Sequence, residues 1–320
     1  MEKIPLLTPA PHLRSAETTS RVMWTVVLAL MPAAAGGVYF FGFHALNIIL
    51  VTILTCVISE VVCQAFFRRP FRIADGSAVV TGLLLSFVIP PTLPLWMAVL
   101  GGFLAIFLVK ELFGGLGYNI FNPALAARAI LLASFPVEMT RFLPPFQPAV
   151  DAVTAATPLA IVKENLAGNL PSLGSLFLGI RPGCLGETSV LLLLVGAAIL
   201  LARKIITWHI PFTYLLTVAL LAAVFRQNVL FHLFSGGLIL GAFFMATDYV
   251  TSPLSTRGKL IFGVGCGVIT MLIRMRGGYP EGVCYAILFM NILVPVIDRA
   301  TMPTVYGQRP VRKMRSGHEN

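Results

Sequence analysis

Hydrophobic residues fall in long, nearly unbroken runs along this chain, with short polar segments between them. Ten of these runs are close to the length of about 20 apolar residues that crosses a bilayer. They lie at residues 22–43, 45–67, 76–92, 94–112, 118–135, 188–204, 208–226, 229–246, 259–276 and 282–300. We therefore expect an all-α polytopic membrane protein with about ten transmembrane helices.

One long connection, residues 136–187, separates the first five runs (22–135) from the last five (188–300). The two blocks resemble each other, because a glycine-led apolar stretch followed by a Gly-Gly pair occurs in both, at Gly82 and Gly114 and again at Gly241 and Gly277. A repeat of five spans in the same order must be inverted across the membrane, since five is odd. The sequence thus predicts two inverted five-helix repeats, with chance similarity of Gly-rich membrane helices as the alternative.

The distribution of Lys and Arg predicts the orientation. When sides alternate, sixteen basic residues fall on the side of residues 1–21 and 301–320, and six fall on the side of the 136–187 connection. Basic residues are concentrated on the cytoplasmic side of membrane proteins. We expect both terminal segments in the cytoplasm, the second as a basic tail, and the long connection on the outer face of a prokaryotic cell membrane.

Composition agrees with a membrane protein surrounded by lipid. The chain is 57% hydrophobic and 11% charged, and its mean hydropathy is +0.88. A soluble protein of this size needs more charge to solvate its surface. The net charge of +10 lies in short loops between spans, which indicates orientation and no nucleic-acid partner.

The sequence predicts no metal site. Its five cysteines form no C-x-x-C pair, and no two histidines stand three or four residues apart. Zinc and iron–sulfur sites usually need such spacings. A metal shared with a partner chain through Cys56 and Cys63, which lie on one helix face, is the minor alternative.

Polar residues in or beside apolar runs are candidates for a polar pathway, because an ionisable group facing lipid is costly. Arg128 lies in the middle of a run and needs a buried acceptor, an anionic ligand or a water channel. Asn119 and Asn122 follow the Gly114 break and suit polar ligands, although Asn also commonly caps helices. Asp248, at a span end, is the fourth candidate.

Signatures of soluble nucleotide enzymes are missing: the sequence has no G-x-G-x-x-G after a strand, no Walker A motif and no G-x-S-x-G motif. The long connection contains a hydroxyl-rich stretch from Asp151 through Thr154 to Thr157, followed by proline. By itself, Thr-Pro indicates a helix start, because Thr caps helices and Pro fits the first helical position.

Five stretches together resemble the family that contains the D subunit of the Rnf complex and the B subunit of the sodium-pumping NADH:quinone oxidoreductase. They occur in the family's order over nearly the whole chain: residues 75–85 (DGSAVVTGLLL), 113–124 (FGGLGYNIFNPA), 151–159 (DAVTAATPL), 183–189 (GCLGETS) and 279–288 (YPEGVCYAIL). The short N-terminal segment is more similar to the Rnf protein than to the quinone-linked relative.

The resemblance implies that FMN is attached covalently, through its phosphate, to the last threonine of an S/T-G-A-T-like motif, which here is Thr157. Ala155 stands where the family usually has glycine. We expect Thr154 and Asp151 to shape the turn, and the returning segment with Gly183, Gly186, Glu187 and Thr188 to cradle phosphate or flavin with backbone N–H groups. The resemblance also implies a second, non-covalent flavin, riboflavin, near the membrane core.

As a function, the resemblance implies one membrane-embedded subunit of an ion-translocating ferredoxin:NAD⁺ oxidoreductase. This subunit relays electrons between flavin and iron–sulfur subunits and helps to couple electron transfer to Na⁺ or H⁺ transport; the chain is not catalytically complete alone. Two alternatives remain at this stage: a B-type subunit of a quinone-linked sodium pump, and a non-redox ten-helix channel or transporter for a small solute.

Overall fold

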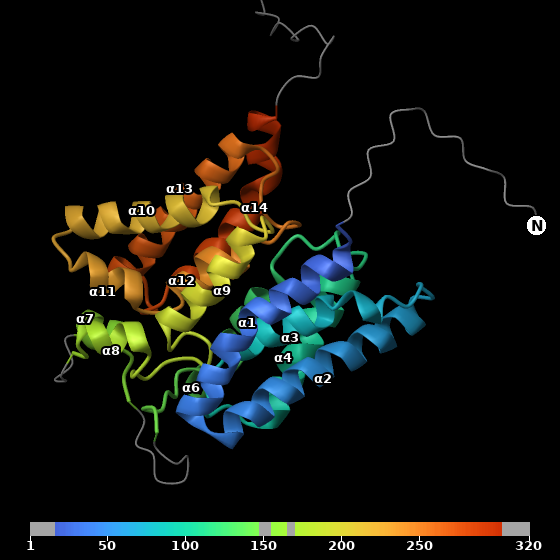
Figure 1. Ribbon diagram of the computed structural model, residues 1–320, viewed down its shortest axis with the longest axis horizontal. Helices are drawn as coiled ribbons and strands as arrows, with labels where there is room; N and C mark the ends of the chain where they lie inside the picture. Colours follow the sequence, from blue (N-terminus) through green and yellow to red (C-terminus); the bar gives the residue numbers. More distant parts are fainter. Residues whose placement is uncertain (1–16, 147–154, 165–169, 303–320) are drawn as a thin grey trace, which may run out of the picture.

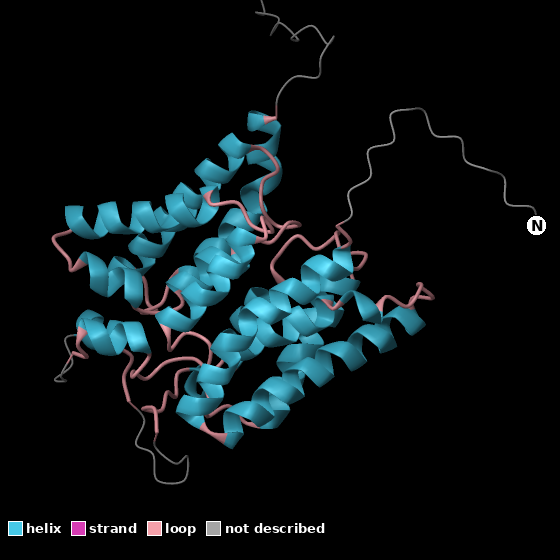
Figure 2. Ribbon diagram, viewed as in Figure 1, coloured by secondary structure: helices cyan, strands magenta, loops and turns pink. Residues whose placement is uncertain are grey.

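A computed structural model describes residues 17–146, 155–164 and 170–302 of the chain. Every regular element within these ranges is helical (Figure 2). Four helices are long and apolar enough to cross a membrane by themselves: α1 (Thr19–Phe41), α2 (Phe43–Phe66), α13 (Thr256–Arg276) and α14 (Val283–Thr301). Shorter apolar helices accompany them, which confirms the expected all-α polytopic membrane protein.

The first block continues after α2 with shorter elements. They are η1 (Ile73–Asp75), α3 (Ser77–Phe87), α4 (Leu95–Leu104), the π-helical η2 (Ala105–Glu111), α5 (Pro123–Ser134) and α6 (Pro136–Met139).

The long connection and the second block contain the remaining elements. They are α7 (Pro158–Glu164), α8 (Leu173–Leu178), α9 (Val190–Ala202), α10 (His209–Val224), α11 (Val229–Phe234), α12 (Leu238–Leu240) and the π-helical η3 (Gly241–Met245), before α13 and α14.

Three of the expected spans differ from the observed helices. The run 76–92 ends as a helix at Phe87, and the run 118–135 becomes helical only at Pro123. The run 229–246 is not one helix: α11 stops at Phe234, and three non-helical residues precede α12. Interrupted helices are tolerated at membrane depth where protein groups satisfy the released backbone.

The two blocks occupy two sides of the molecule in Figure 1 and meet along α1 and α9. In the first block α2 packs against α3 and α4, and in the second block α10 packs against η3 and α13. The last helices of the two blocks, α5 and α14, also contact each other. This matched set of contacts is the arrangement expected of two related five-helix units.

Small side chains line the contact between the blocks, and large apolar ones face outward. Ala29 and Ala33 of α1 and Ala197 of α9 are all buried, as small residues at close helix contacts in membranes usually are. On α2, an exposed row of large side chains at intervals of four residues faces away from the protein, toward lipid or a partner subunit: Leu50, Leu54, Ile58 and Val62.

Candidate functional site

Thr157 lies directly before α7, on the connection between the two blocks, and it is only 6% exposed. Its Oγ1 accepts a hydrogen bond from the Ala160 N–H at 3.3 Å, and Pro158 begins the helix. This is the helix-start geometry that Thr-Pro favours. An ester oxygen keeps its lone pairs, so the same atom is able to cap α7 and carry a phosphoester.

Hydrogen bonds hold α7 and the residues before it against the rest of the protein. The Lys163 ammonium donates to the Ile273 carbonyl at 3.0 Å and to the Tyr279 carbonyl at 2.6 Å. On the other side of Thr157, the Ala155 N–H donates to the Phe142 carbonyl at 3.0 Å. The position of Thr157 is thereby set by both blocks.

A small pocket surrounds Thr157, and we call it the Thr157 pocket. It encloses about 240 Å³ of space, including its mouth, and its walls include Arg181, Gly183, Glu187, Gly236 and Glu281. These residues come from the segment before α9, the break after α11 and the segment before α14. Three segments that are distant in sequence therefore meet at the hydroxyl-bearing residue.

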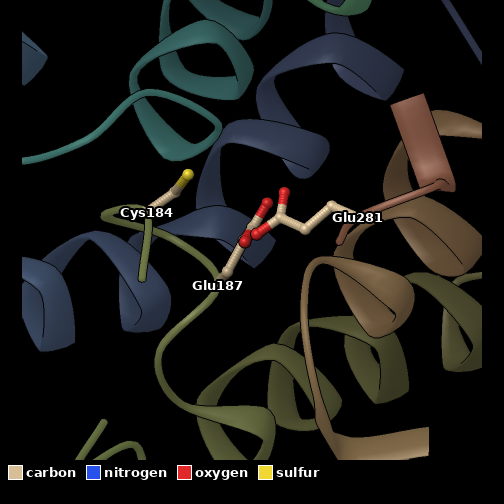
Figure 3. A group of neighbouring side chains, drawn as sticks. All are labelled: Cys184, Glu187 and Glu281. Atoms are coloured by element: carbon tan, nitrogen blue, oxygen red, sulfur yellow. The ribbon is translucent and has the colours of Figure 1, made fainter. Parts of the chain in front are cut away.

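Arg128 reaches this pocket from α5 and pairs with both of its carboxyl groups. Its Nη1 lies 3.3 Å from Glu187 Oε1, and its Nη2 lies 2.5 Å from Glu281 Oε2 and 3.9 Å from Cys184 Sγ. Figure 3 shows the two carboxyl groups turned toward each other. The side-chain ligand atoms of Cys184, Glu187 and Glu281 lie within 4.8 Å of one another, as in a metal site, and the guanidinium supplies their positive charge.

Burial, reinforced by the charge of Glu281, raises the pKa of Glu187 to about 8. The two carboxyl groups therefore do not carry their full negative charge near neutral pH. Burial lowers the pKa of Arg181 to about 10, so this guanidinium still remains charged. The pocket beside Thr157 is consequently richer in positive charge than a count of its acidic residues suggests.

Two arginines complete the pocket by binding carbonyl groups at the break after α11. Arg181 donates to the Phe234 carbonyl and, at 2.5 Å, to the Glu187 carbonyl. Arg274 donates to the His232 carbonyl at 2.7 Å and to the Ser235 carbonyl at 3.0 Å. These carbonyls have lost their helical partners, and the guanidinium groups replace them.

The segment with Gly183, Gly186, Glu187 and Thr188 lies where the sequence predicts, but it uses its backbone differently. The Gly186 N–H donates to the Phe87 carbonyl at 3.0 Å, and the Glu187 N–H donates to the Cys184 carbonyl at 3.2 Å. The expectation that these N–H groups are free for phosphate is therefore wrong. Thr188 Oγ1 faces the Leu185 carbonyl at 3.4 Å.

Gly186 is required for packing. A Cβ atom there would lie 2.2 Å from Phe87 Cγ, far inside contact distance. Gly183 differs, because a Cβ there would meet nothing within 4 Å. Of the four predicted residues, Gly183 and Glu187 line the Thr157 pocket.

A second, larger space, the internal cavity, lies near the other ends of α5 and α9. It encloses about 800 Å³, including its mouth, and it is lined by Lys110, Asn119, Asn122 and Asp248 among mainly apolar side chains of α1, α3, α9 and η3. Largely apolar cavities with a few convergent polar groups are typical of cofactor sites. Three of the four polar-pathway candidates therefore meet in one cavity.

Asn122 has the structural role that Asn commonly takes. Its Oδ1 accepts hydrogen bonds from the N–H groups of Ala124 at 3.1 Å and Leu125 at 3.3 Å, at the start of α5. Its Nδ2 donates to the Met245 carbonyl of η3 at 3.3 Å, which joins the two blocks. Asn119 donates to the Phe121 carbonyl at 3.1 Å, so its Oδ1 is the amide atom that this bond leaves unused.

Asp151 and Thr154 lie outside the described residues, and their predicted role in shaping the turn stays a prediction.

Comparison with known proteins agrees with this geometry. A family profile described as NQR2, RnfD, RnfE matches residues 6–307, which is nearly the whole chain. The chain belongs to this family. The resemblance identified from the five motifs is thereby confirmed.

Similar proteins within the NQR2, RnfD, RnfE family are named as D subunits of redox-driven pumps. The chain is 47% identical to that of the Na⁺-translocating ferredoxin:NAD⁺ oxidoreductase complex of Acetobacterium woodii, covering 95% of this chain and 96% of the relative. It is 45% identical to that of the proton-translocating ferredoxin:NAD⁺ oxidoreductase complex of Clostridium ljungdahlii, with the same coverages. The counterpart from the ion-translocating oxidoreductase complex of Stutzerimonas stutzeri is 42% identical, with 91% and 93% covered.

Within this member of the NQR2, RnfD, RnfE family, sequence reasoning missed four residues that shape the sites. Arg181 and Arg274 look like loop charges in the sequence, and Glu281 is separated from its partner Arg128 by 153 positions. Lys110 looks like a residue at a span end, yet it is 2% exposed. The one available signal was the resemblance itself, because residues 279–288 are one of the five matching motifs.

Proposed function

We propose that this chain is the membrane-embedded, flavin-carrying D subunit of an ion-translocating ferredoxin:NAD⁺ oxidoreductase complex. The observation that carries the proposal is the placement of Thr157, the motif threonine, in a pocket bordered by buried arginines, in a chain that matches the D subunits of such complexes over nearly its full length. The chain relays electrons and depends on partner subunits that hold the other flavin and iron–sulfur groups.

The residues around Thr157 fit the phosphate end of FMN. Arg181 borders the pocket, and Arg274 Nη2 lies 3.3 Å from where a Cβ of Gly236 would stand. Guanidinium groups suit phosphate oxygens. The open side of Gly183 leaves room for the remainder of the cofactor. We assign FMN to a phosphoester with Thr157, where it supplies the electron-carrying chemistry.

The internal cavity fits the second, non-covalent flavin, for which we propose riboflavin. Its apolar walls suit a flat ring system, and Asn119, Asn122 and Lys110 offer polar contacts at one side. The two proposed flavin sites lie at opposite ends of α5, so the relay would run along this helix.

The coupling ion is Na⁺ or H⁺. The relatives from Acetobacterium woodii and Clostridium ljungdahlii are almost equally similar to this chain, and their names give Na⁺ and H⁺ respectively. We place the complex in a prokaryotic cell membrane, with both termini of this chain cytoplasmic and Thr157 at the outer face, on the basis of the Lys/Arg distribution.

Replacing Thr157 tests the proposal directly. The chain is produced together with a flavin-attaching enzyme, because a threonine hydroxyl is a poor nucleophile without activation. Thr157→Ala should abolish in-gel flavin fluorescence of the denatured chain, because it removes the only oxygen of that side chain. Electron flow through the assembled complex should be lost with it.

Two control variants sharpen this experiment. Thr157→Ser keeps the hydroxyl and should keep the fluorescence, whereas Thr154→Ala removes a neighbouring hydroxyl and should also keep it. Fluorescence that survives in Thr157→Ala, or that is absent from the wild-type chain, would show the attachment site to be wrong.

A further inference from the structure

A buried ion pair lies beside the internal cavity. Lys110 Nζ is 2.5 Å from Glu60 Oε1, and each side chain is 2% exposed. The same ammonium donates to Ser77 Oγ at 2.7 Å. Ser77 Oγ donates in turn to Asp75 Oδ1 at 2.7 Å, which forms one continuous polar chain across three elements.

This polar chain separates two cavities. Lys110 and Ser77 line the internal cavity, whereas Glu60 and Asp75 line a second one, the loop cavity, of about 640 Å³ including its mouth. The loop cavity is also lined by Gln64, Glu111 and Tyr118, near the loop that the Lys/Arg distribution places in the cytoplasm.

Glu60 has an unused acceptor. Its Oε2 is buried and has no hydrogen-bond partner among the described residues, although Oε1 is paired with Lys110. Glu60 itself is 1% exposed and belongs to the lining of the loop cavity. A buried carboxylate oxygen without a donor is costly, and it is the group expected to bind a small cation that enters this cavity.

The charges around Glu60 leave it dependent on Lys110. Asp75 and Glu111 are acidic neighbours, and Arg69 is engaged with Glu111 at 3.3 Å. Arg72 also lines the loop cavity and adds positive charge at its edge. Cys56, on the same helix, is a buried thiol next to the pair. If Lys110 turned away, Glu60 would need another cation or a proton.

The backbone at Lys110 supports such a movement. Lys110 lies in the π-helical η2, which ends at Glu111 and is followed by Gly114 and Gly115 with positive φ values of 132° and 91°. Single π-helical turns occur frequently at functional sites. The lysine ammonium sits on a flexible four-carbon stem, so it is able to change partners without a shift of the helix.

We propose that the Lys110 ammonium is a charge switch between Glu60 and the internal cavity. This inference rests on the proposed flavin in that cavity. Each electron that the flavin receives from an iron–sulfur or flavin donor of the complex without a proton adds one negative charge. Lys110 then turns to this charge, and Glu60 binds one monovalent cation, H⁺ or Na⁺, from the loop cavity, so that charge balances.

The experiment measures the midpoint potential of the internal flavin in the purified complex by dithionite titration. The covalent flavin is removed with the Thr157→Ala background, so that its signal does not interfere. Potentials are recorded at several Na⁺ concentrations at fixed pH, and at several pH values at fixed Na⁺. One cation bound per electron shifts the potential by about 59 mV per tenfold change in cation concentration.

The variants are Lys110→Met, Glu60→Gln and, as a control lysine distant in sequence, Lys259→Met. Lys110→Met should lower the potential, because the reduced flavin loses its counter-charge, and should flatten the cation dependence. Glu60→Gln should raise the potential and also flatten the cation dependence. Lys259→Met should behave as the wild type does. The double variant Glu60→Gln/Lys110→Met removes both charges and replaces Lys110→Met if that variant fails to fold.

The outcomes separate the two levels of the proposal. A Na⁺ slope that the variants lose identifies Na⁺ as the cation. A pH slope that they reduce, together with a reduction-induced carboxylic-acid infrared band missing in Glu60→Gln, identifies H⁺. Slopes and potentials equal to wild type in Lys110→Met or its double variant would overturn the charge switch alone. A complex without internal flavin in the Thr157→Ala background would overturn the second flavin and the switch together.

Discussion

Arg128 shows how far single residues were predictable. Its position in the middle of an apolar run requires a partner for its charge, and the structure supplies two carboxyl groups. Neither partner was predictable from spacing, because Glu187 and Glu281 are 59 and 153 positions away. Thr157 was predictable from the family motif, but its burial was not, because the segment that covers it comes from the second block.

Arg128→Leu should destabilise the protein by roughly 3–5 kcal/mol, because it leaves Glu187 and Glu281 buried without their counter-charge. Removing the ion pair as a whole costs less, so Arg128→Leu/Glu281→Leu should recover much of the loss. Thermal unfolding in detergent, followed by tryptophan fluorescence, measures both variants. A double variant no more stable than Arg128→Leu would contradict the assignment of Glu281 as the main partner.

At the scale of elements, hydropathy located the spans but not their interruptions. The run 229–246 has the composition of one helix, yet it breaks after Phe234. The break depends on Arg181 and Arg274, which bind the released carbonyls from two other segments. Local sequence contains no trace of these donors, so a window of apolar residues predicts a continuous helix.

Gly236 is the residue of this break with a left-handed backbone, at φ 65°. Gly236→Ala should cost about 1–2 kcal/mol from this conformation alone. Its Cβ would also lie 3.0 Å from Leu159 Cδ1, two residues after Thr157. We expect a lower unfolding temperature and reduced flavin labelling of Thr157, measured by in-gel fluorescence.

Gly278→Ala is the matched control, since a Cβ there meets nothing within 4 Å. This variant should label as the wild type does. Equal labelling of Gly236→Ala and Gly278→Ala would mean that the break does not support the Thr157 pocket.

At the scale of the whole molecule, the repeat and the orientation rest on different evidence. The contacts of α2 with α3 and α4 match those of α10 with η3 and α13, which supports the two related blocks. The orientation follows from sixteen basic residues against six. Helix packing is the same whichever end of the protein faces the cytoplasm, so the orientation stays a prediction from charge.

Labelling of introduced cysteines tests the orientation. Phe71→Cys and Val137→Cys place a thiol at positions that are 62% and 63% exposed. The native cysteines are all buried, so they should give little background. In intact cells an impermeant maleimide should label Val137→Cys and not Phe71→Cys. The reverse pattern would invert the topology and place Thr157 inside.

The shortness of α5 has a consequence for the electrical work of the protein. Its twelve residues rise about 18 Å, against about 30 Å for the apolar core of a bilayer. Polar cavities lie near both of its ends, so the insulating layer between them is thin and the membrane voltage falls steeply along this helix. Moving one charge through the full potential is worth about 2.3 kcal/mol per 100 mV. An electron passing between the two sites would therefore respond to membrane voltage as well as to the redox potentials of its carriers.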